Sequence, residues 1–234
     1  SDVIVGRIAA EHRGGYDVWS SVGEGPAQLS GRLARTLEDE NATGVGDWPG
    51  VGDWVTLAAP PGPDRVSLID RVLSRKTVFL RGVAGRQSRG QVVAANVDLV
   101  FVVCGLDGDY NIRRIERYLA RIWASGAQPV VVLNKSDITE TGDQRAVEVE
   151  GSCPGVAVVV ASALRSEGLA LIEERLPRGI TAAFVGSSGA GKSTLVNRLG
   201  GRDLMPTSEV RSDDPSATCP APPGRSDCGH ARHA

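Results

Sequence analysis

The residues best able to do chemistry form a glycine-rich segment that matches the pattern G-x4-G-K-[ST]. An apolar stretch at 182–185 precedes it and a helix expected at 193–199 follows it, which is the setting of a phosphate-binding loop. In such a loop, backbone N–H groups turn toward the phosphates and the helix N-terminus adds positive potential. We therefore expect nucleotide phosphates to be bound by Gly186, Ser187, Ser188, Gly189, Ala190, Gly191, Lys192, Ser193 and Thr194.

Two of these residues are expected to act on the reacting phosphates. Lys192 would reach the β and γ phosphates, and the hydroxyl of Ser193 would bind Mg²⁺. The alternative is a glycine-rich turn that binds nothing. The strand expected before the loop and the helix expected after it argue against that alternative.

A second polar cluster follows an apolar strand expected at 129–133 and consists of Asn134, Lys135, Ser136 and Asp137. This N-K-x-D set suits guanine, because the carboxylate can accept from N1–H and N2–H₂, the amide can approach N7 and O6, and the lysine stem can cover the ring. Adenine would leave an acceptor of the carboxylate unpaired, and sites built to accept hydrogen bonds discriminate strongly against a ligand that lacks the donors. Taken alone, the tetrapeptide could equally be an ordinary polar loop.

A third segment has only small residues, Ser162 and Ala163, after another apolar strand. Small side chains there would allow a backbone N–H to approach the guanine O6. In an ordinary P-loop GTPase the phosphate loop precedes N-K-x-D, whereas here it comes last. The order therefore predicts a circularly permuted GTPase domain that binds GTP or GDP.

The elements that must position these loops alternate between strands and helices from about residue 95. Strands are expected at 98–105, 129–133, 156–161 and 181–185, and helices at 112–124 and 169–176. Unbroken apolar strands that alternate with helices predict a mostly parallel sheet covered on both faces, an α/β fold. Ligands of such sheets bind at the carboxyl ends of the strands, which is where all three motifs lie.

The N-terminal third reads as five short strands separated by turn residues, expected at 3–9, 16–22, 27–34, 53–58 and 66–72. This spacing predicts a small all-β barrel, and an OB-fold and an SH3-like barrel remain alternatives on the pattern alone. Within it we expect Trp54 to be buried and Trp48, in a glycine-rich loop, to be exposed.

These patterns divide the chain into a barrel at 1–75, a basic connector at 76–94, the GTPase domain at 95–211 and an irregular tail at 212–234. The connector is expected to be a solvated linker, with RNA contact as the alternative.

Composition narrows the class of protein. The 234 residues carry 26 Lys and Arg against 28 Asp and Glu, a net charge of -2, and 41% are hydrophobic. A chain disordered throughout is excluded, and any RNA contact must come from a local patch. No apolar run is as long as the roughly 18 residues that a membrane-spanning helix needs, and no N-terminal signal peptide is visible. We therefore expect a cytoplasmic protein.

Taken together, the motifs resemble those of the ribosome small-subunit-dependent GTPases, the RsgA or YjeQ family. Besides the permuted motifs, the resemblance rests on segments 50–55, 71–77, 91–98 and 111–120, and it covers about residues 5–211. It implies an N-terminal OB-fold that binds RNA, a GTPase domain and a C-terminal zinc module. It also implies GTP hydrolysis with Mg²⁺ during late maturation of the small (30S) ribosomal subunit, with this subunit and its rRNA as partners.

The tail departs from the family pattern. Cys219, Cys228 and His230 resemble three zinc ligands, but a fourth Cys is absent and structural zinc sites need four ligands. The family's switch segment and Asp-x-x-Gly motif are not visible after residue 212. If they are missing, nucleotide binding is expected to survive better than hydrolysis.

Two other functions remain compatible with the sequence. One is an rRNA-binding assembly factor gated by nucleotide, with little or no turnover. The other is a P-loop small-molecule kinase or ATPase, which the set Asn134 to Asp137 and the lack of an arginine-rich lid disfavour. We expect the chain to be a monomer.

Overall fold

The computed structural model describes residues 3–41, 48–81 and 91–201. These residues form two compact units, which are described separately. The first contains the described residues up to 100 together with 117–129, and the second contains 101–116 and the described residues from 130 onward. Among the described helices, none combines the length and the apolar character needed to span a membrane.

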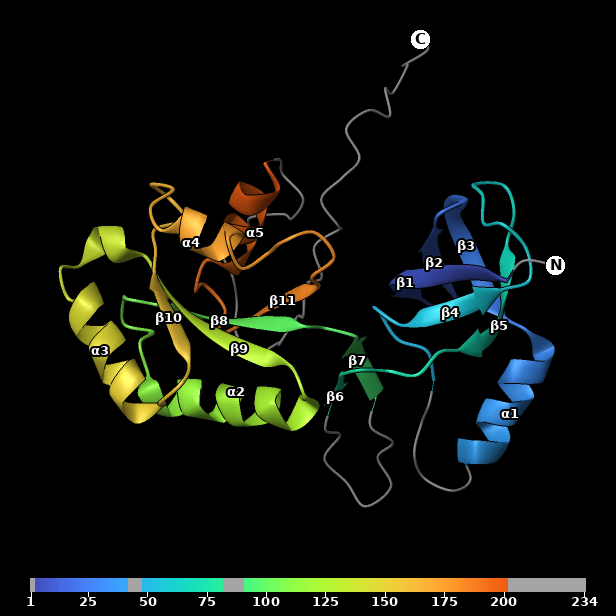
Figure 1. The fold of residues 1–234 in the computed structure, drawn as a ribbon, viewed down its shortest axis with the longest axis horizontal. Coiled ribbons are helices and arrows are strands. Elements are labelled where there is room, and N and C mark those ends of the chain that lie inside the picture. Colours follow the sequence, from blue (N-terminus) through green and yellow to red (C-terminus); the bar gives the residue numbers. More distant parts are fainter. Residues whose placement is uncertain (1–2, 42–47, 82–90, 202–234) are drawn as a thin grey trace, which may run out of the picture. The chain divides into compact units, whose positions relative to one another are not determined.

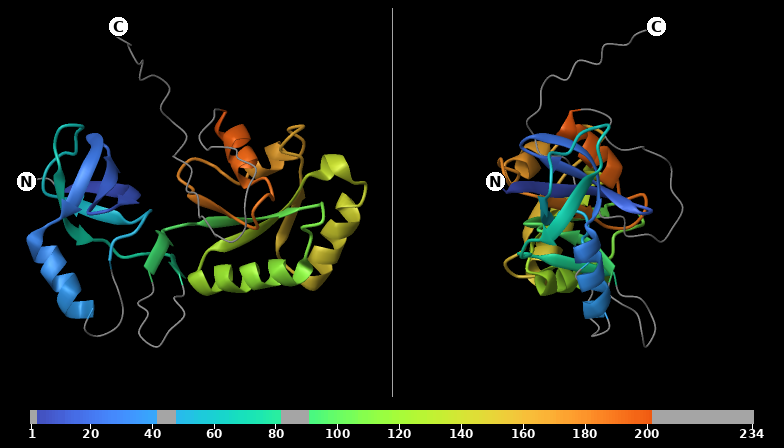
Figure 2. Two further views of the ribbon diagram at one scale, coloured as in Figure 1. Left: turned by 180° about the vertical axis from the view of Figure 1, so that it is seen from behind. Right: turned by 90° about the vertical axis from the view of Figure 1, so that its right-hand side faces the viewer.

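The first unit contains a closed five-stranded barrel with strand order β1-β2-β3-β5-β4. Its strands are β1 (Ile4–His12), β2 (Gly15–Ser20), β3 (Gly23–Leu29), β4 (Trp54–Leu57) and β5 (Ser67–Val72). The β3–β5 pair is parallel, and the other pairs are antiparallel. A helix, α1 (Gly31–Asn41), connects β3 to β4 and lies next to β3 and β5 (Figure 2). This order and this helix are those of an OB-fold, which decides against the SH3-like alternative.

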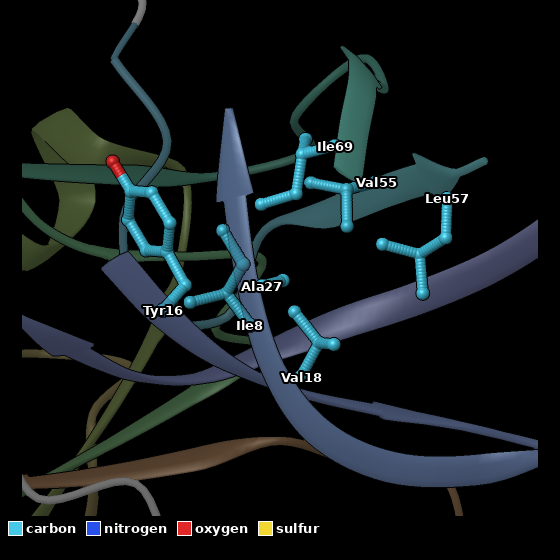
Figure 3. Packing of buried hydrophobic residues seen from close by; sticks show 7 residues of the cluster. All are labelled: Ile8, Tyr16, Val18, Ala27, Val55, Leu57 and Ile69. Atoms are coloured by element: carbon cyan, nitrogen blue, oxygen red, sulfur yellow. The ribbon is translucent and has the colours of Figure 1, made fainter. Parts of the chain in front are cut away.

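Alternating residues of the five strands fill the barrel (Figure 3). Because side chains point to opposite faces along a strand, every second residue faces inward. The buried cluster consists of Ile8, Tyr16, Val18, Ala27, Val55, Leu57 and Ile69. Burial raises the pKa of Tyr16 to about 12, with smaller contributions from nearby carboxylates, so this core tyrosine stays neutral.

The strand expected at 27–34 is wrong in its second half. β3 ends at Leu29, and the hydroxyl of Ser30 accepts a hydrogen bond of 3.2 Å from the backbone N–H of Leu33, which caps α1. The Ser30 backbone N–H donates to the carbonyl of Ile69 at 2.9 Å. The cap residue therefore redirects a segment whose apolar pattern alone favoured a longer strand.

The prediction that Trp54 is buried is also wrong, since 41% of this residue is exposed. The register of β4 turns Val55 and Leu57 into the barrel and therefore turns Trp54 outward. There the guanidinium of Arg7 lies 5.2 Å from the centre of the indole ring. Arg7 also pairs in register with Trp19 on the next strand, so the two tryptophans flank one arginine. Trp48 is exposed, as expected.

The two ends of the expected connector pair with each other. β6 (Val78–Arg81) and β7 (Gln91–Ala95) form a two-stranded antiparallel ribbon, where the sequence pattern had favoured a solvated linker. Just before the ribbon, Arg75 donates to the fully buried carboxylate of Asp53 through Nε at 2.8 Å and Nη2 at 2.7 Å. The same carboxylate accepts from the backbone N–H of Gly50 at 2.8 Å, so it fixes the turn before β4.

The second unit contains most of a four-stranded sheet with order β10-β9-β8-β11, and only the first two residues of β8 and of β9 are assigned to the first unit (Figure 1). The strands are β8 (Leu99–Gly105), β9 (Gln128–Asn134), β10 (Ala157–Val160) and β11 (Ala182–Val185), and β9 and β10 pair in parallel. β8 is buried along its whole length, as expected for a strand covered on both faces. Phe101 of β8 and Phe184 of β11 stack with their ring centres 4.8 Å apart.

The helices of this part of the chain are α2 (Ile112–Ser125), α3 (Gly142–Ser152), α4 (Leu169–Glu173) and α5 (Lys192–Gly200), with a 3₁₀ turn at Ser136–Ile138. Figure 1 shows α3 on one side of the sheet and α4 and α5 on the other. The sequence pattern predicted three of these helices but not α3. The α/β architecture with both faces covered is confirmed.

Candidate functional site

Four loops follow the carboxyl ends of the four strands and make the candidate site. We name them the phosphate loop (186–194, after β11), the base loop (134–137, at the end of β9), the small-residue loop (162–163, after β10) and the acidic loop (105–111, at the end of β8). The carboxyl ends of parallel strands meet at one edge of a sheet, which brings these loops together.

Asn134 joins three of the loops through its side chain. Its amide nitrogen donates to the carbonyl of Ala190 at 2.8 Å, and its amide oxygen accepts from the backbone N–H of Ala163 at 3.0 Å. Its own carbonyl accepts from the N–H of Leu106 at 2.8 Å. Asn134 is only 2% exposed, and both ends of its buried side-chain amide are hydrogen-bonded to other protein groups. The predicted base loop, small-residue loop and phosphate loop are thus placed side by side.

Asp137 is held by the small-residue loop. Its Oδ1 accepts a hydrogen bond of 2.5 Å from the hydroxyl of Ser162. That bond is the main cause that lowers the pKa of Asp137 below its usual value, so the carboxylate is ionised at neutral pH. An ionised carboxylate only accepts hydrogen bonds, which suits the paired N–H donors of guanine. Ser136 adds a backbone link, since its N–H donates to the carbonyl of Ala161 at 3.1 Å.

Lys135 occupies the left-handed region with φ 68° and pairs with Asp107 of the acidic loop. Burial raises the pKa of Asp107, but the hydrogen bonds from Lys135 and from the backbone N–H of Asp109 outweigh it and lower the pKa overall. Asp107 is therefore a charged anchor for the lysine of the base loop.

The phosphate loop folds around the ammonium of Lys192. Its Nζ donates to the carbonyls of Gly186 at 3.0 Å and Ser187 at 2.8 Å. Burial lowers the pKa of Lys192, and the nearby Asp109 carboxylate partly opposes this shift. A phosphate chain would supply the negative charge that favours the ammonium form.

Two further features of this loop fit an anionic ligand. The hydroxyl of Ser188 is buried and has no hydrogen-bond partner among the described residues. Gly189 and Gly191 both have positive φ, which shapes a concave backbone ahead of α5. Ser193 and Thr194 lie in the first turn of α5. The Ser193 hydroxyl alone is enough protein ligand for Mg²⁺, because this ion usually keeps water molecules and substrate phosphates as its other ligands.

The acidic loop was missed by the sequence reasoning. Asp109 accepts a hydrogen bond from the hydroxyl of Ser187 and another from Arg114 Nη2 at 2.6 Å. A signal was available, because Asp107 and Asp109 directly follow a wholly apolar strand whose carboxyl end belongs at the ligand edge. Neither aspartate, however, belongs to a phosphate-binding or base-binding motif.

The predicted zinc ligands Cys219, Cys228 and His230 lie outside the described residues. Within residues 3–41, 48–81 and 91–201, no group of three or more His, Cys, Asp or Glu could hold a metal ion. Cys104 and Cys153 are buried free thiols, and burial raises the pKa of both.

The sequence matches a known protein family over more than half of its length. The family described as RsgA GTPase matches residues 72–216. The "Small ribosomal subunit biogenesis GTPase RsgA 2" of Lactiplantibacillus plantarum is 40% identical over 211 residues, which are 90% of this chain and 58% of that protein. The RsgA protein of Opitutus terrae is 46% identical over 208 residues, 86% of this chain and 55% of that protein. The chain thus spans about half the length of these curated relatives.

Two solved structures share the fold. YjeQ from Thermotoga maritima superposes with a TM-score of 0.65 at 24% identity, covering 90% of this chain and 68% of that chain. YloQ, described as a circularly permuted GTPase, superposes with a TM-score of 0.60 at 20% identity, covering 84% of this chain and 64% of that chain. The predicted combination of an N-terminal barrel with a permuted P-loop domain is therefore confirmed as a fold.

Proposed function

Because the chain belongs to the RsgA GTPase family, we propose that it binds GTP with Mg²⁺ and hydrolyses GTP to GDP and phosphate. The observation that supports this most is the pair of hydrogen bonds at the Asn134 side chain, which donates to the carbonyl of Ala190 and accepts from the N–H of Ala163. They tie the base loop to the phosphate loop and to the small-residue loop. A site for a base and a site for phosphates are then a fixed distance apart, as a nucleotide requires. All of these residues fall in the domain predicted at 95–211, whose boundaries remain a prediction.

Guanine recognition is assigned to the base loop. Asp137 accepts from N1–H and N2–H₂, and its ionised state is favoured by the hydrogen bond from Ser162. The backbone of Ala163 lies in the loop that would approach O6. An adenine nucleotide offers Asp137 one donor fewer, which leaves a charged acceptor unpaired and gives strong discrimination.

Phosphate binding is assigned to the phosphate loop. Lys192 exchanges its contacts with the carbonyls of Gly186 and Ser187 for phosphate oxygens, and its charge stabilises the negative charge that develops as the γ phosphate leaves. The Ser188 hydroxyl gains a hydrogen-bond partner. When bound through the Ser193 hydroxyl, Mg²⁺ neutralises part of the phosphate charge.

We further propose that the protein acts in the cytoplasm and that its partners are the small ribosomal subunit and the rRNA of this subunit. Relatives that are 40% and 46% identical are named for small ribosomal subunit biogenesis. The barrel has two exposed tryptophans, Trp19 and Trp54. Each lies opposite Arg7 of β1, on the strand to one side of it. Aromatic side chains of this kind stack on nucleic-acid bases, and the OB-fold commonly binds oligonucleotides.

Competition binding and phosphate release test the proposal. Unlabelled GTP should displace a fluorescent guanine nucleotide from the protein far better than ATP does, and equal displacement by ATP would reject guanine recognition. Phosphate release from GTP should rise when small subunits are added and should be lost in Lys192→Ala. Tight GTP binding without release, with or without subunits, would favour the assembly factor that does not turn over.

A further inference from the structure

The acidic loop contacts both halves of the candidate site although it contains neither nucleotide motif. Asp107 pairs with Lys135 of the base loop, and Asp109 accepts from the hydroxyl of Ser187 in the phosphate loop. The two carboxylates are two residues apart in sequence. A single short loop therefore contacts the base lysine on one side and the phosphate loop on the other.

The acidic loop is itself fixed by its neighbours. The backbone N–H of Asp109 donates to the side chain of Asp107 at 3.0 Å, and Arg114 binds Asp109 from the first turn of α2. Asn111 caps that helix, because its Oδ1 accepts from the N–H of Arg114 at 3.0 Å. Tyr110 lies under the guanidinium of Arg145 from α3, 4.5 Å from the ring centre. Both carboxylates are thus presented from a braced loop.

We propose that Asp107 and Asp109 are positioning residues for the nucleotide, in which Asp107 holds Lys135 against the base and Asp109 holds Ser187 and with it the start of the phosphate loop. This inference rests on the proposed function. Neither carboxylate needs to touch the nucleotide, since each acts through the residue that it binds. Ligand groups held in place before binding lose less freedom on binding, which raises affinity.

The expected effects follow from the exposure of each pair. The Asp107 and Lys135 side chains are 33% and 31% exposed, so solvent screens their attraction, and Asp107→Asn should weaken GDP binding by about threefold to tenfold. Asp109 is less exposed, at 22%, and receives two hydrogen bonds, so Asp109→Asn should weaken GDP binding by about tenfold. The carboxylate variants Asp107→Glu and Asp109→Glu should recover part of each loss.

Double-mutant cycles on the full chain test whether each carboxylate acts through its partner. GDP dissociation constants are measured by titration calorimetry for Asp107→Asn, Lys135→Ala and the double variant, and likewise for Asp109→Asn, Ser187→Ala and their double variant. Asp143→Asn, an exposed carboxylate in the first turn of α3, is the matched control and should bind GDP as the unmodified protein does. In each cycle the aspartate substitution should add less than about twofold when it is made in the background of its partner's variant, because the residue that the carboxylate holds is already gone.

The outcomes separate the two claims. Additive losses, or aspartate variants that bind GDP as tightly as the unmodified protein, overturn the positioning roles and leave the proposed function standing. If the unmodified protein does not bind GDP, the proposed function fails and the inference fails with it. Circular dichroism of each variant checks folding. Should Asp109→Asn not fold, Ser187→Ala removes the same hydrogen bond from the other side, and unchanged GDP binding in it contradicts the role of Asp109.

Discussion

Two glycines of the phosphate loop give a matched pair of substitutions that tests the role of Asn134. Gly189 and Gly191 have positive φ values of 78° and 94°, so alanine is strained at both. A Cβ on Gly189 would meet nothing within 4 Å, whereas a Cβ on Gly191 would lie 2.2 Å from Nδ2 of Asn134. We expect Gly191→Ala to destabilise the protein much more than Gly189→Ala does.

The difference can be estimated from the hydrogen bonds at stake. Backbone strain costs both variants about 1–2 kcal/mol. Relieving the clash must also move the buried amide of Asn134 away from Ala190 and Ala163, which leaves a buried acceptor and a buried donor unpaired. Each costs about 1–3 kcal/mol, so Gly191→Ala should lose about 2–4 kcal/mol more than Gly189→Ala after partial relaxation.

Urea unfolding without nucleotide measures this difference. Circular dichroism at 222 nm follows the helices. Fluorescence is followed in a Trp123→Phe background, which removes the tryptophan of α2 and leaves Trp19, Trp48 and Trp54 to report the first unit. The dichroism midpoint should fall in Gly191→Ala, and the fluorescence transition should change little. Equal losses of stability in the two alanine variants would refute the argument that Asn134 holds the loops together.

Three further outcomes concern the stability and reactivity of other buried groups. Arg75→Met should cost about 3–5 kcal/mol in the fluorescence-detected urea unfolding, because the carboxylate of Asp53 stays buried without its cation; a loss below about 1 kcal/mol would show that the pair matters little. Ser30→Ala should cost about 1 kcal/mol in the same assay by removing the cap of α1, and an unchanged midpoint would contradict the cap. Cys104 and Cys153 should resist iodoacetamide at pH 8 until urea is added, because burial raises the pKa of both thiols and blocks access; fast modification of the folded protein, seen by peptide mass spectrometry, would contradict this.

The sequence was most informative where motif and element agree. The phosphate loop lies between β11 and α5, and the base loop lies at the end of β9, as their spacing predicted. Nucleotide binding can be predicted from these motifs because glycines, a lysine and a carboxylate at this fixed spacing seldom occur for another reason. What the motifs could not give is the link between them, since the contacts of Asn134 with Ala163 and Ala190 join residues 29 and 56 positions apart.

The elements that escaped prediction have weak local signals. In α3 the described buried residues are only Gly142 and Val149, so no apolar stripe marks it as a helix. Trp54 was misplaced because its size favours burial, whereas the register of β4 decides which face it occupies. The acidic loop carries no motif, and its role emerges only from contacts with residues of two other loops.

Base selectivity tests the central claim most directly. In Asp137→Asn the carboxylate that should accept from N1–H and N2–H₂ becomes an amide, whose NH₂ can instead donate to the C2 carbonyl of xanthine. Dissociation constants for GDP and xanthosine diphosphate should favour GDP strongly in the unmodified protein and reverse in Asp137→Asn. A preference for GDP that is unchanged by the substitution would contradict the assignment of Asp137 to guanine and, with it, the account of the site.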